Sequence, residues 1–575
     1  MVMSSKYPQY VFRAIMEETN GTTRRTSTPS GHSAHKSFFQ RLQHFRKELK
    51  EVTFLLMVTV LSAGFGSPFL IGYNTGVINV PQKVLSEWIR STECEKARYI
   101  SSHSGLNASW VNATREEERW CRTLNSTEHS EEMEKNVKLR MMWIGVNLAF
   151  CCGGILGAIL SHYRVDLLGR KWTLVTNNAG AIVGGILQGI AYPTSSYAAF
   201  IIGRIFVGIN AGVSTAVAPV YFMGLVPPSL AGAFGALQRL FDVCGTLLAF
   251  VLGLPSILGG PTTWPYLVGF VVIPATLQLL VLPMCPEDPK YLSEAEGHEG
   301  EAEAVVRQLR HSPSKIEEEL REMREKEKQA EQQPKWKFTD MMHDPTLRIV
   351  VLVGFVVISC RQLTGINAAY FFSTAIFESA GLTGTSPLYG TVGVGATMVI
   401  ATLLTALLVE KLGRRPLLLT GLCGTALTTA LLTTFIVLHE TASEKSQNPK
   451  EFSSIQADWA PFVSMAVLFV YLIVYSCGPG TIPSFMIAEM FHEKDKTIAN
   501  SVELLVHWTC GALVVVAFPL LQGKIHGYVF IFFTVLSIFY IVIVVLWLPE
   551  TKKQEPEQVQ EQVAKRVRKC ICKPH

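Results

Sequence analysis

The chain has 575 residues, of which 49% are hydrophobic and only 17% are charged. A soluble protein usually carries about a quarter charged residues, so the composition argues against a soluble globular fold. The net charge of +5 is modest, and its basic residues collect in short loops between apolar segments. Nucleic-acid binding is therefore a poor interpretation.

Apolar segments of about the length that crosses a bilayer follow one another along the chain. Residues 1–50 contain no apolar core of a cleavable signal peptide, so the first segment is expected to target the chain. The twelve predicted spans are 53–79, 140–162, 172–191, 197–223, 232–254, 264–283, 347–374, 386–409, 416–438, 459–486, 497–521 and 526–548.

The long polar loop at 80–139 is expected to be extracellular. It carries three glycosylation sequons, at Asn107, Asn112 and Asn125, and three in one hydrophilic loop indicate the outer side of a membrane. Cys94 and Cys121 lie in the same loop. They can form a disulfide if the loop is extracellular, or remain free thiols.

Alternation of the spans then places both termini and the linker 286–346 in the cytosol. The Lys and Arg residues of the short loops fall on the same side, as the positive-inside rule requires. The linker is rich in Glu, Lys and Arg at i,i+4 spacing, which predicts a small intracellular helical subdomain.

Two motifs recur about half a chain apart. Asp166–Lys171 is repeated as Glu410–Arg415, and Pro286–Pro289 is repeated as Pro549–Thr551. Such repeats predict an all-α membrane protein of two six-helix halves. The expected order is a cytosolic tail at 1–51, the first half at 52–285, the linker at 286–346, the second half at 347–549 and a cytosolic tail at 550–575.

Over residues 52–553 these motifs resemble the sugar porter branch of the major facilitator superfamily, above all the facilitative glucose transporters. The resemblance implies the twelve-helix fold of that superfamily and a transporter, not an enzyme. Trp264–Leu267 is similar to the branch that includes fructose and urate carriers. The motifs that carry the resemblance are Gly72–Gln82, Asp166–Lys171, Gly203-Arg204, Pro286–Pro289, Gln362–Asn367, Glu410–Arg415, Gly478–Gly480 and Pro549–Lys552.

Gln362 and Asn367 are the predicted substrate-binding amides. Amides donate and accept hydrogen bonds, as sugar hydroxyls require, but these two share a helix face only if the helix is broken near Gly365. The resemblance implies that both contact substrate and that Trp508 is a cavity aromatic. Hydrogen bonding between packed helices is the alternative.

Proton coupling is not expected. The position of Asn74 is an aspartate in the proton-driven sugar porters that the chain resembles, and an amide cannot cycle a proton. Uniport is therefore favoured, and Asn74 is assigned to the substrate pathway. Proton coupling through His507 or Glu503 is the alternative.

Two arginines depart from the family pattern, which has glutamine at the positions of Arg239 and Arg361. His507 likewise replaces an asparagine, and Ser484 a tryptophan. An arginine at mid-membrane needs a partner. Asp242 could neutralise Arg239, and Glu503 or His507 could serve Arg361. Alternatively, the guanidiniums face the cavity and bind an organic anion such as urate.

Gating is assigned to a proline-rich break and to charges at the cytosolic helix ends. Gly478, Pro479 and Pro483 interrupt span 10, either as a hinge for alternating access or as a fixed kink. The family's glutamate and arginine beyond span 4 are absent, which predicts a weakened cytosolic network. Its expected members are Asp166, Arg170, Lys171, Arg204, Glu410, Arg414, Arg415, Glu489 and Lys496.

The predicted function is plasma-membrane uniport of a small hydrophilic solute, most simply a hexose such as glucose or fructose. The alternatives are an organic-anion carrier that uses Arg239 and Arg361, and a nutrient sensor without useful flux. The expected partners are the solute and the lipid bilayer, with no cofactor and no metal.

Overall fold

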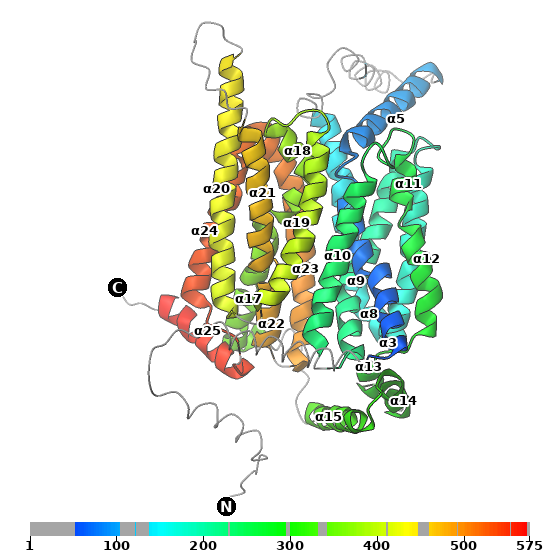
Figure 1. Cartoon of the computed structure of the whole chain (residues 1–575), viewed down its shortest axis with the longest axis vertical. Helices are drawn as coiled ribbons and strands as arrows, with labels where there is room; N and C mark the ends of the chain where they lie inside the picture. Colours follow the sequence, from blue (N-terminus) through cyan, green and yellow to red (C-terminus); the bar gives the residue numbers. More distant parts are fainter. Residues whose placement is uncertain are drawn as a thin grey trace, which may run out of the picture. The chain divides into compact units, whose positions relative to one another are not determined.

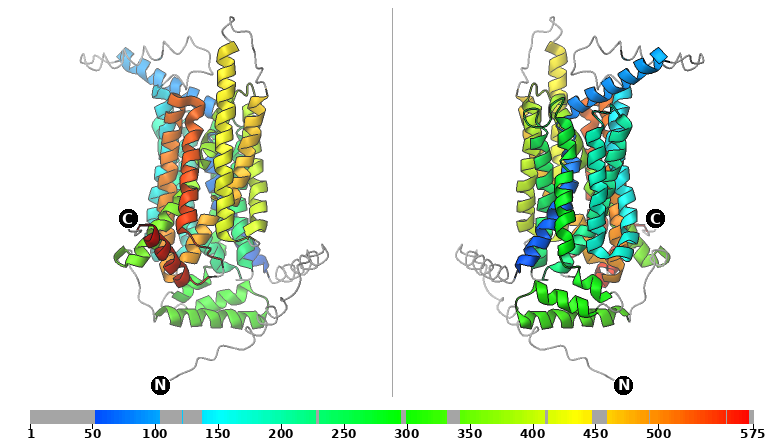
Figure 2. Two further views of the ribbon diagram at one scale, coloured as in Figure 1. Left: turned by 90° about the vertical axis from the view of Figure 1, so that its left-hand side faces the viewer. Right: turned by 90° about the vertical axis from the view of Figure 1, so that its right-hand side faces the viewer.

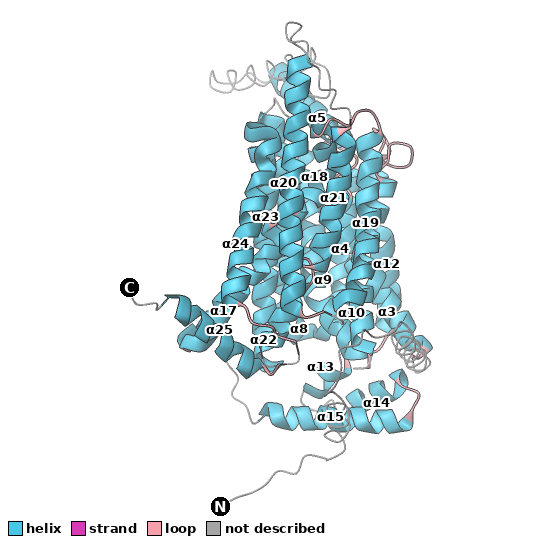
Figure 3. Cartoon of the chain, turned by 60° about the vertical axis from the view of Figure 1, so that its left-hand side comes forward, coloured by secondary structure: helices cyan, strands magenta, loops and turns pink. Residues whose placement is uncertain are grey.

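The computed structural model describes residues 52–103, 121, 137–227, 230–294, 299–331, 342–409, 412–446, 459–491, 493–552 and 554–571. Figure 3 shows that the described residues form helices joined by short loops. The three sequons, Glu410 and the N-terminal segment 1–51 lie outside the described residues, and so does the side chain of Lys496.

The first half of the chain supplies six passes, of which the first and the sixth are broken into shorter helices. Its helices are α3 (Phe54–Gly66), α4 (Pro68–Gly76), α8 (Val137–Ile190), α9 (Tyr197–Leu225), α10 (Ala231–Leu252), α11 (Trp264–Gly269), α12 (Val272–Val281) and η3 (Leu282–Met284). A further helix, α5 (Gln82–His103), extends from one end of the bundle (Figure 1).

The second half repeats this plan. Its helices are α17 (Pro345–Leu363), α18 (Ile366–Ser379), α19 (Ser386–Val409), α20 (Arg414–Ser446), α21 (Ala460–Cys477), α22 (Ile482–Met490), α23 (Glu493–Ile525), η4 (His526–Tyr528) and α24 (Val529–Trp547).

Ten continuous segments in the described part of the chain are long and apolar enough to cross a membrane. Two of them hold two predicted spans each, Val137–Ile190 and Ala499–Trp547. Gly169 divides the first of these with a left-handed φ of 77°, a conformation that glycine adopts without steric cost. The twelve predicted passes are thus confirmed, and α19 begins and ends as predicted.

The two halves pack through pairs of helices from opposite halves. Within the bundle α10 packs against α19 and α8 against α23, and Figure 1 shows the two groups of helices side by side. Glycines allow close approach inside the first half: a Cβ on Gly72 would overlap the backbone of Asp242, and one on Gly245 the backbone of Phe69. Small residues at such crossings are the usual way for membrane helices to pack closely.

Three short helices of the linker lie across the end of the bundle opposite α5, which is called the linker end below (Figures 1 and 2). They are α13 (Pro289–Glu294), α14 (Glu299–Leu309) and α15 (Pro313–Glu331). Arg310 joins them to the bundle, because it donates to the carbonyl oxygen of Leu225 and pairs with Glu319 at 2.9 Å. The predicted helical subdomain is therefore present.

The C-terminal segment differs from the expected free tail. Residues Pro556–Ile571 form an amphipathic helix, α25, at the linker end (Figure 1). It packs against α17, α22 and α24 through buried Val559, Val563 and Val567. Each buried valine stabilises the contact by about 1.5–3 kcal/mol, so the segment belongs to the folded bundle.

Cys94 and Cys121 form a disulfide. It ties α5 to residue 121 at the end of the bundle that carries α5, which is called the α5 end below. Of the two alternatives for these cysteines, the disulfide is the one present.

Candidate functional site

A break in span 7 brings the two predicted amides together. The helix ends at Leu363, and Gly365 takes a left-handed φ of 104° before α18 begins. Asn367 Nδ2 then donates to Gln362 Oε1 at 2.7 Å, and Gln362 Nε2 lies 2.6 Å from Nδ1 of His507. Since Gln362 donates with this nitrogen, His507 accepts and carries its own proton on Nε2 when neutral.

Two tyrosines that the sequence analysis did not select stabilise this break. A helix end leaves carbonyl groups without intrahelical partners. Tyr475 donates to the carbonyl oxygen of Arg361 at 2.7 Å, and Tyr471 donates to that of Thr364 at 3.1 Å. Their i,i+4 spacing on an apolar span is the only signal that could have indicated them.

Arg361 is neutralised from α23. Its Nη1 lies 3.6 Å from Glu503 Oε1 and donates to Ser484 Oγ at 3.2 Å, while Ser484 donates to the same carboxylate. The Ser484 hydroxyl therefore links the two charged groups. Of the two expected candidates, Glu503 is therefore the partner of Arg361, whereas His507 is hydrogen-bonded to Gln362.

Arg239 is neutralised one turn away on its own helix. It pairs with Asp242, and its Nη2 donates to the hydroxyl of Tyr370 at 3.1 Å. Tyr370 belongs to α18, so this contact joins the two halves. Both arginines therefore have a carboxylate beside them.

Trp508 lies at the interface of the two halves. Its ring is edge-on to Phe150 at 5.7 Å between centroids, and a Cβ on Gly154 would overlap the indole. Its indole nitrogen has no hydrogen-bond partner among the described residues.

Asn74 is not part of the amide cluster. Its side chain donates to the carbonyl oxygen of Leu70, and its own carbonyl accepts from Arg204 Nη1 at 3.0 Å. Arg204 is fully buried, with its guanidinium 4.6 Å from the centre of the Phe150 ring.

The assignment of Arg204 to the cytosolic charge network is wrong in position. Arg204 is the eighth residue of α9. The linker contacts the opposite end of that helix, where Arg310 donates to the carbonyl oxygen of Leu225. At 1.5 Å per residue the 21 intervening steps amount to about 30 Å. The short Gly-Arg motif carries no information on depth.

Asn79 connects the halves near the α5 end. Its Nδ2 donates to the carbonyl oxygen of Tyr370 and to Ser373 Oγ, both at 2.8 Å. Lys83 and Glu378 add an ion pair of 2.9 Å between α5 and α18. Asn79 lies within the Gly72–Gln82 motif, which by itself does not predict a contact with the second half.

At the linker end, the first-half network is built around two acids after span 6. Arg170 pairs with Asp288, and the backbone N–H of Lys171 donates to Glu287 Oε1 at 2.8 Å. Burial raises the pKa of Asp288, although Arg170 opposes the shift. Burial also raises the pKa of Glu287, against the N–H groups that donate to it.

This arrangement corrects two expectations. Asp166 is exposed, and its ion-pair partner is His162 at 3.9 Å. Gly224 occupies the position of the missing glutamate beyond span 4, and a Cβ on this glycine would overlap the Asp288 carboxylate. Asp288 thus supplies Arg170 with a carboxylate that the sequence analysis counted as missing.

The second half repeats the same geometry. The backbone N–H groups of Arg414 and Arg415 donate to Glu550 at 2.8 and 3.2 Å, as that of Lys171 does to Glu287. Arg414 also pairs with Glu489 at 2.9 Å. The repeated motifs therefore have the same structural role in both halves. In each half, a carboxylate that follows the sixth span accepts hydrogen bonds from the backbone N–H groups that follow the second span.

The glycine-proline motif interrupts span 10 as expected. α21 ends at Cys477, and α22 begins at Ile482 with Pro483 as its second residue. A Cβ on Gly478 would overlap Gly421 of α20, so Gly478 and Pro479 lie where two helices touch. Among the described residues, no three His, Cys, Asp or Glu side chains are placed to hold a metal ion.

Comparison with known proteins agrees with this geometry. The model of the family described as "Sugar (and other) transporter" matches residues 59–563. The chain is 32% identical over 500 residues to "Facilitated glucose transporter protein 1" of Caenorhabditis elegans, covering 87% of this chain and 89% of that protein. It is also 32% identical over 510 residues to "Solute carrier family 2, facilitated glucose transporter member 4" of Bos taurus, covering 89% and 91%.

Among solved structures, the fold is similar to the xylose transporter XylE from E. coli in an inward open conformation. The TM-score is 0.62 at 18% identity, over 88% of this chain and 99% of that one. A structure of the proton:xylose symporter XylE bound to 6-bromo-6-deoxy-D-glucose gives a TM-score of 0.64 at 19% identity, over 88% and 98%. At this identity the likeness establishes the fold.

Proposed function

Because the chain belongs to the sugar transporter family, a family of multi-pass membrane transporters and not of enzymes, we propose that it is a facilitative carrier of a hexose. Transport proceeds by rocking of the two six-helix halves about a site at mid-membrane. Relatives named as facilitated glucose transporters support the hexose as substrate.

The observation that carries this proposal is the cluster of Gln362, Asn367 and His507. Its members come from α17, α18 and α23 and already hydrogen-bond to one another. An amide–amide–imidazole chain offers donors and acceptors without a net charge when the imidazole is neutral. A sugar hydroxyl can replace one internal bond and both donate and accept in its place.

Charge balance supports a neutral solute over an organic anion. Arg239 pairs with Asp242, and Arg361 with Glu503. An anion would have to compete with a carboxylate that is already in place for each guanidinium. Like charges brought together in a site of low dielectric repel strongly.

Uniport is supported by the surroundings of Arg204. Arg204 donates a hydrogen bond to the backbone carbonyl of Asn74, and the side chain at position 74 is an amide. An amide does not titrate at physiological pH. A protonophore that collapses the proton gradient is therefore expected to leave the initial uptake rate unchanged.

The proposed location is the plasma membrane, with both termini and the linker end on the cytosolic side. The basic residues of the short loops support this orientation through the positive-inside rule. The disulfide at the α5 end also supports an outward position for that end, since disulfides persist in oxidising compartments.

Uptake of radiolabelled glucose, fructose and urate into proteoliposomes tests the proposal. Saturable hexose uptake is expected, and Gln362→Ala should reduce it at least 10-fold because buried partners are left unpaired. Gln558→Ala, on an exposed position of α25, is the matched control. Urate uptake that is lost in Arg361→Gln, without hexose uptake, would establish the anion carrier instead.

A further inference from the structure

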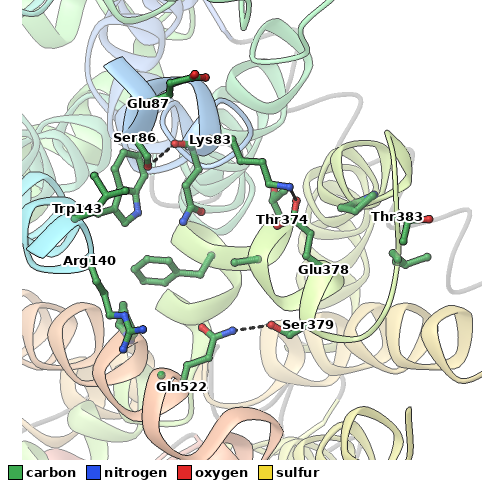
Figure 4. Close-up of a pocket in the computed structure, with 18 of the residues that line it drawn as sticks. Lys83, Ser86, Glu87, Arg140, Trp143, Thr374, Glu378, Ser379, Thr383 and Gln522 are labelled. Carbon is green, nitrogen blue, oxygen red and sulfur yellow. Dashed lines mark hydrogen bonds and ion pairs between the residues drawn. The ribbon is translucent and has the colours of Figure 1, made fainter. Parts of the chain in front are cut away.

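A cavity of about 660 Å³ lies at the α5 end, away from the amide cluster. Its walls are the first turns of α5 and α8, the last turns of α18 and α23, and the loop after α18 (Figure 4). Glu378 in its wall lies eleven residues beyond Asn367, which is about 16 Å along a helix. The volume falls in the range of about 300–1,000 Å³ that is usual for small-molecule sites.

An aromatic stack marks the side of this cavity that faces the amide cluster. Phe372 lines the cavity and stacks on Phe518, with 5.4 Å between the ring centroids. Phe518 is itself buried in the bundle and packs on Phe533, whose ring lies beside Gly365. The rings thus stand between the cavity and the break in span 7.

Trp143 supplies a donor without a partner. Its side chain is buried, with 2% of the residue exposed, and it lines the cavity. The indole N–H has no acceptor among the described residues, and Figure 4 shows the nitrogen on the side of the ring toward the cavity. A buried N–H that is left unpaired is costly, so an acceptor in the cavity would stabilise it.

Amide, hydroxyl and charged groups face this indole. Gln522 Nε2 donates to Ser379 Oγ at 2.9 Å, and its amide has capacity for further bonds. Lys83 and Glu378 form an ion pair of 2.9 Å at the wall, and Figure 4 shows both pairs facing the same space. A balanced ion pair, an amide and aromatic surfaces are the groups that bind the hydroxyls and C–H faces of a sugar ring.

We propose that this cavity is a second sugar-binding site, in which a hexose is held at the α5 end before it passes the Phe372–Phe518 stack. The inference rests on the proposed hexose substrate. It adds a distinct site with its own residues, Trp143 and Gln522. The indole N–H of Trp143 is the donor that gains an acceptor when the sugar binds.

Equilibrium binding of radiolabelled glucose and fructose to the purified full chain in lipid nanodiscs tests this site. The wild type should bind two molecules of the transported hexose per chain. Gln362→Ala should retain one, the molecule in the cavity at the α5 end. Trp143→Phe removes the N–H and keeps an aromatic ring. In the Gln362→Ala background it should lower the affinity for the remaining hexose molecule at least 5-fold.

Trp88→Phe is the matched control. Trp88 is also a buried indole at the α5 end, but it packs on Trp264 and Phe200 with ring centroids 4.8 and 5.7 Å apart. It should leave both molecules bound with wild-type affinity. A second probe is Gly523→Ala, whose methyl group would meet the Arg140 guanidinium in the cavity wall and should weaken the same molecule.

The outcomes separate this inference from the proposed function. One bound hexose in the wild type, or unchanged binding in both Trp143→Phe and Gly523→Ala, overturns the second site while hexose flux still supports the carrier. Hexose binding in the cavity without flux in proteoliposomes contradicts the carrier and leaves the site established. An equal loss of hexose binding in Trp88→Phe and Trp143→Phe would show that the packing of the indole rings, and not the N–H of Trp143, determines the affinity, and would contradict the proposed role of Trp143.

Discussion

Arg361 of α17 and Glu503 of α23 approach to 3.6 Å beside the first turn of α22, where the Ser484 hydroxyl is hydrogen-bonded to both. The three residues come from three separate helices. The guanidinium is thereby held next to the amide cluster with its charge balanced. This arrangement explains how an arginine can occupy a largely buried position in a membrane-spanning helix.

Arg361→Gln should destabilise the protein by about 1–3 kcal/mol, because it leaves the largely buried Glu503 carboxylate without its cation. The measurement is the thermal unfolding midpoint of the purified chain, together with hexose uptake. Uptake should persist at a reduced rate, since the amides remain.

The double variant Arg361→Gln with Glu503→Gln distinguishes pairing from solute binding. If the two side chains mainly neutralise each other, removing both should restore stability to within about 1 kcal/mol of the wild type. A double variant that is no more stable than Arg361→Gln would show that the guanidinium has another partner.

Gly365→Ala should destabilise the chain by about 1–3 kcal/mol and strongly reduce hexose uptake. A Cβ is strained at a φ of 104°, and it would lie 3.0 Å from the Phe533 ring. The shift separates the amides that the break brings together. Unfolding and uptake measurements on the same preparation check both effects.

Gly180→Ala serves as the comparison for that variant. Gly180 is a helical glycine in α8, and a Cβ there would meet nothing within 4 Å. Alanine should be neutral or slightly stabilising at such a position. Similar losses in the two variants would mean that left-handed backbone geometry is not what Gly365 contributes.

Glu287→Gln should alter how stability depends on pH. The pKa of Glu287 is raised by burial, so its stabilising contribution is complete below the ordinary glutamate pKa of about 4.3 and is lost as pH rises through the folded value. The unfolding midpoint of the wild type, minus that of the variant, should therefore increase as pH falls from 7 toward about 4.5. A difference that shrinks on acidification would contradict the burial of this carboxylate.

Glycosidase treatment should reveal the orientation in the membrane. If the loop between α5 and α8 is outside, the chain from cells should lose mass on removal of N-glycans. Replacement of Asn107, Asn112 and Asn125 by Gln should abolish that change. Two results together would contradict the proposed orientation. The wild-type chain would carry no N-glycan, and cysteines engineered into the loop would react with a membrane-impermeant thiol reagent only after the cells are permeabilised.

The membrane passes and the break in span 7 could be predicted because each is determined by residues that are close together in the sequence. Apolar length locates a helix, and a glycine between two polar residues on one span indicates an interruption. Gly365 between Gln362 and Asn367 is therefore the feature from which a shared position of the two amides can be predicted. The neutralisation of Arg239 by Asp242 follows equally from their spacing on one helix.

Contacts between distant segments could not be predicted in the same way. The depth of Arg204 depends on where α9 begins, and the role of Asp288 depends on the space that Gly224 leaves. Tyr471 and Tyr475 resemble ordinary apolar packing until the carbonyl groups that they satisfy are located. Such pairings require the crossing of helices in three dimensions.

The interruption at Gly365 couples recognition to motion. Any molecule that bridges Gln362 on one segment and Asn367 on the next fixes the angle between α17 and α18, and α18 carries the Tyr370 and Ser373 groups that Asn79 holds from the opposite half. Binding of a solute to the two amides is therefore expected to affect the hydrogen bonds of Asn79 that join the two halves. A solute that hydrogen-bonds to only one of the two amides would bind without being transported.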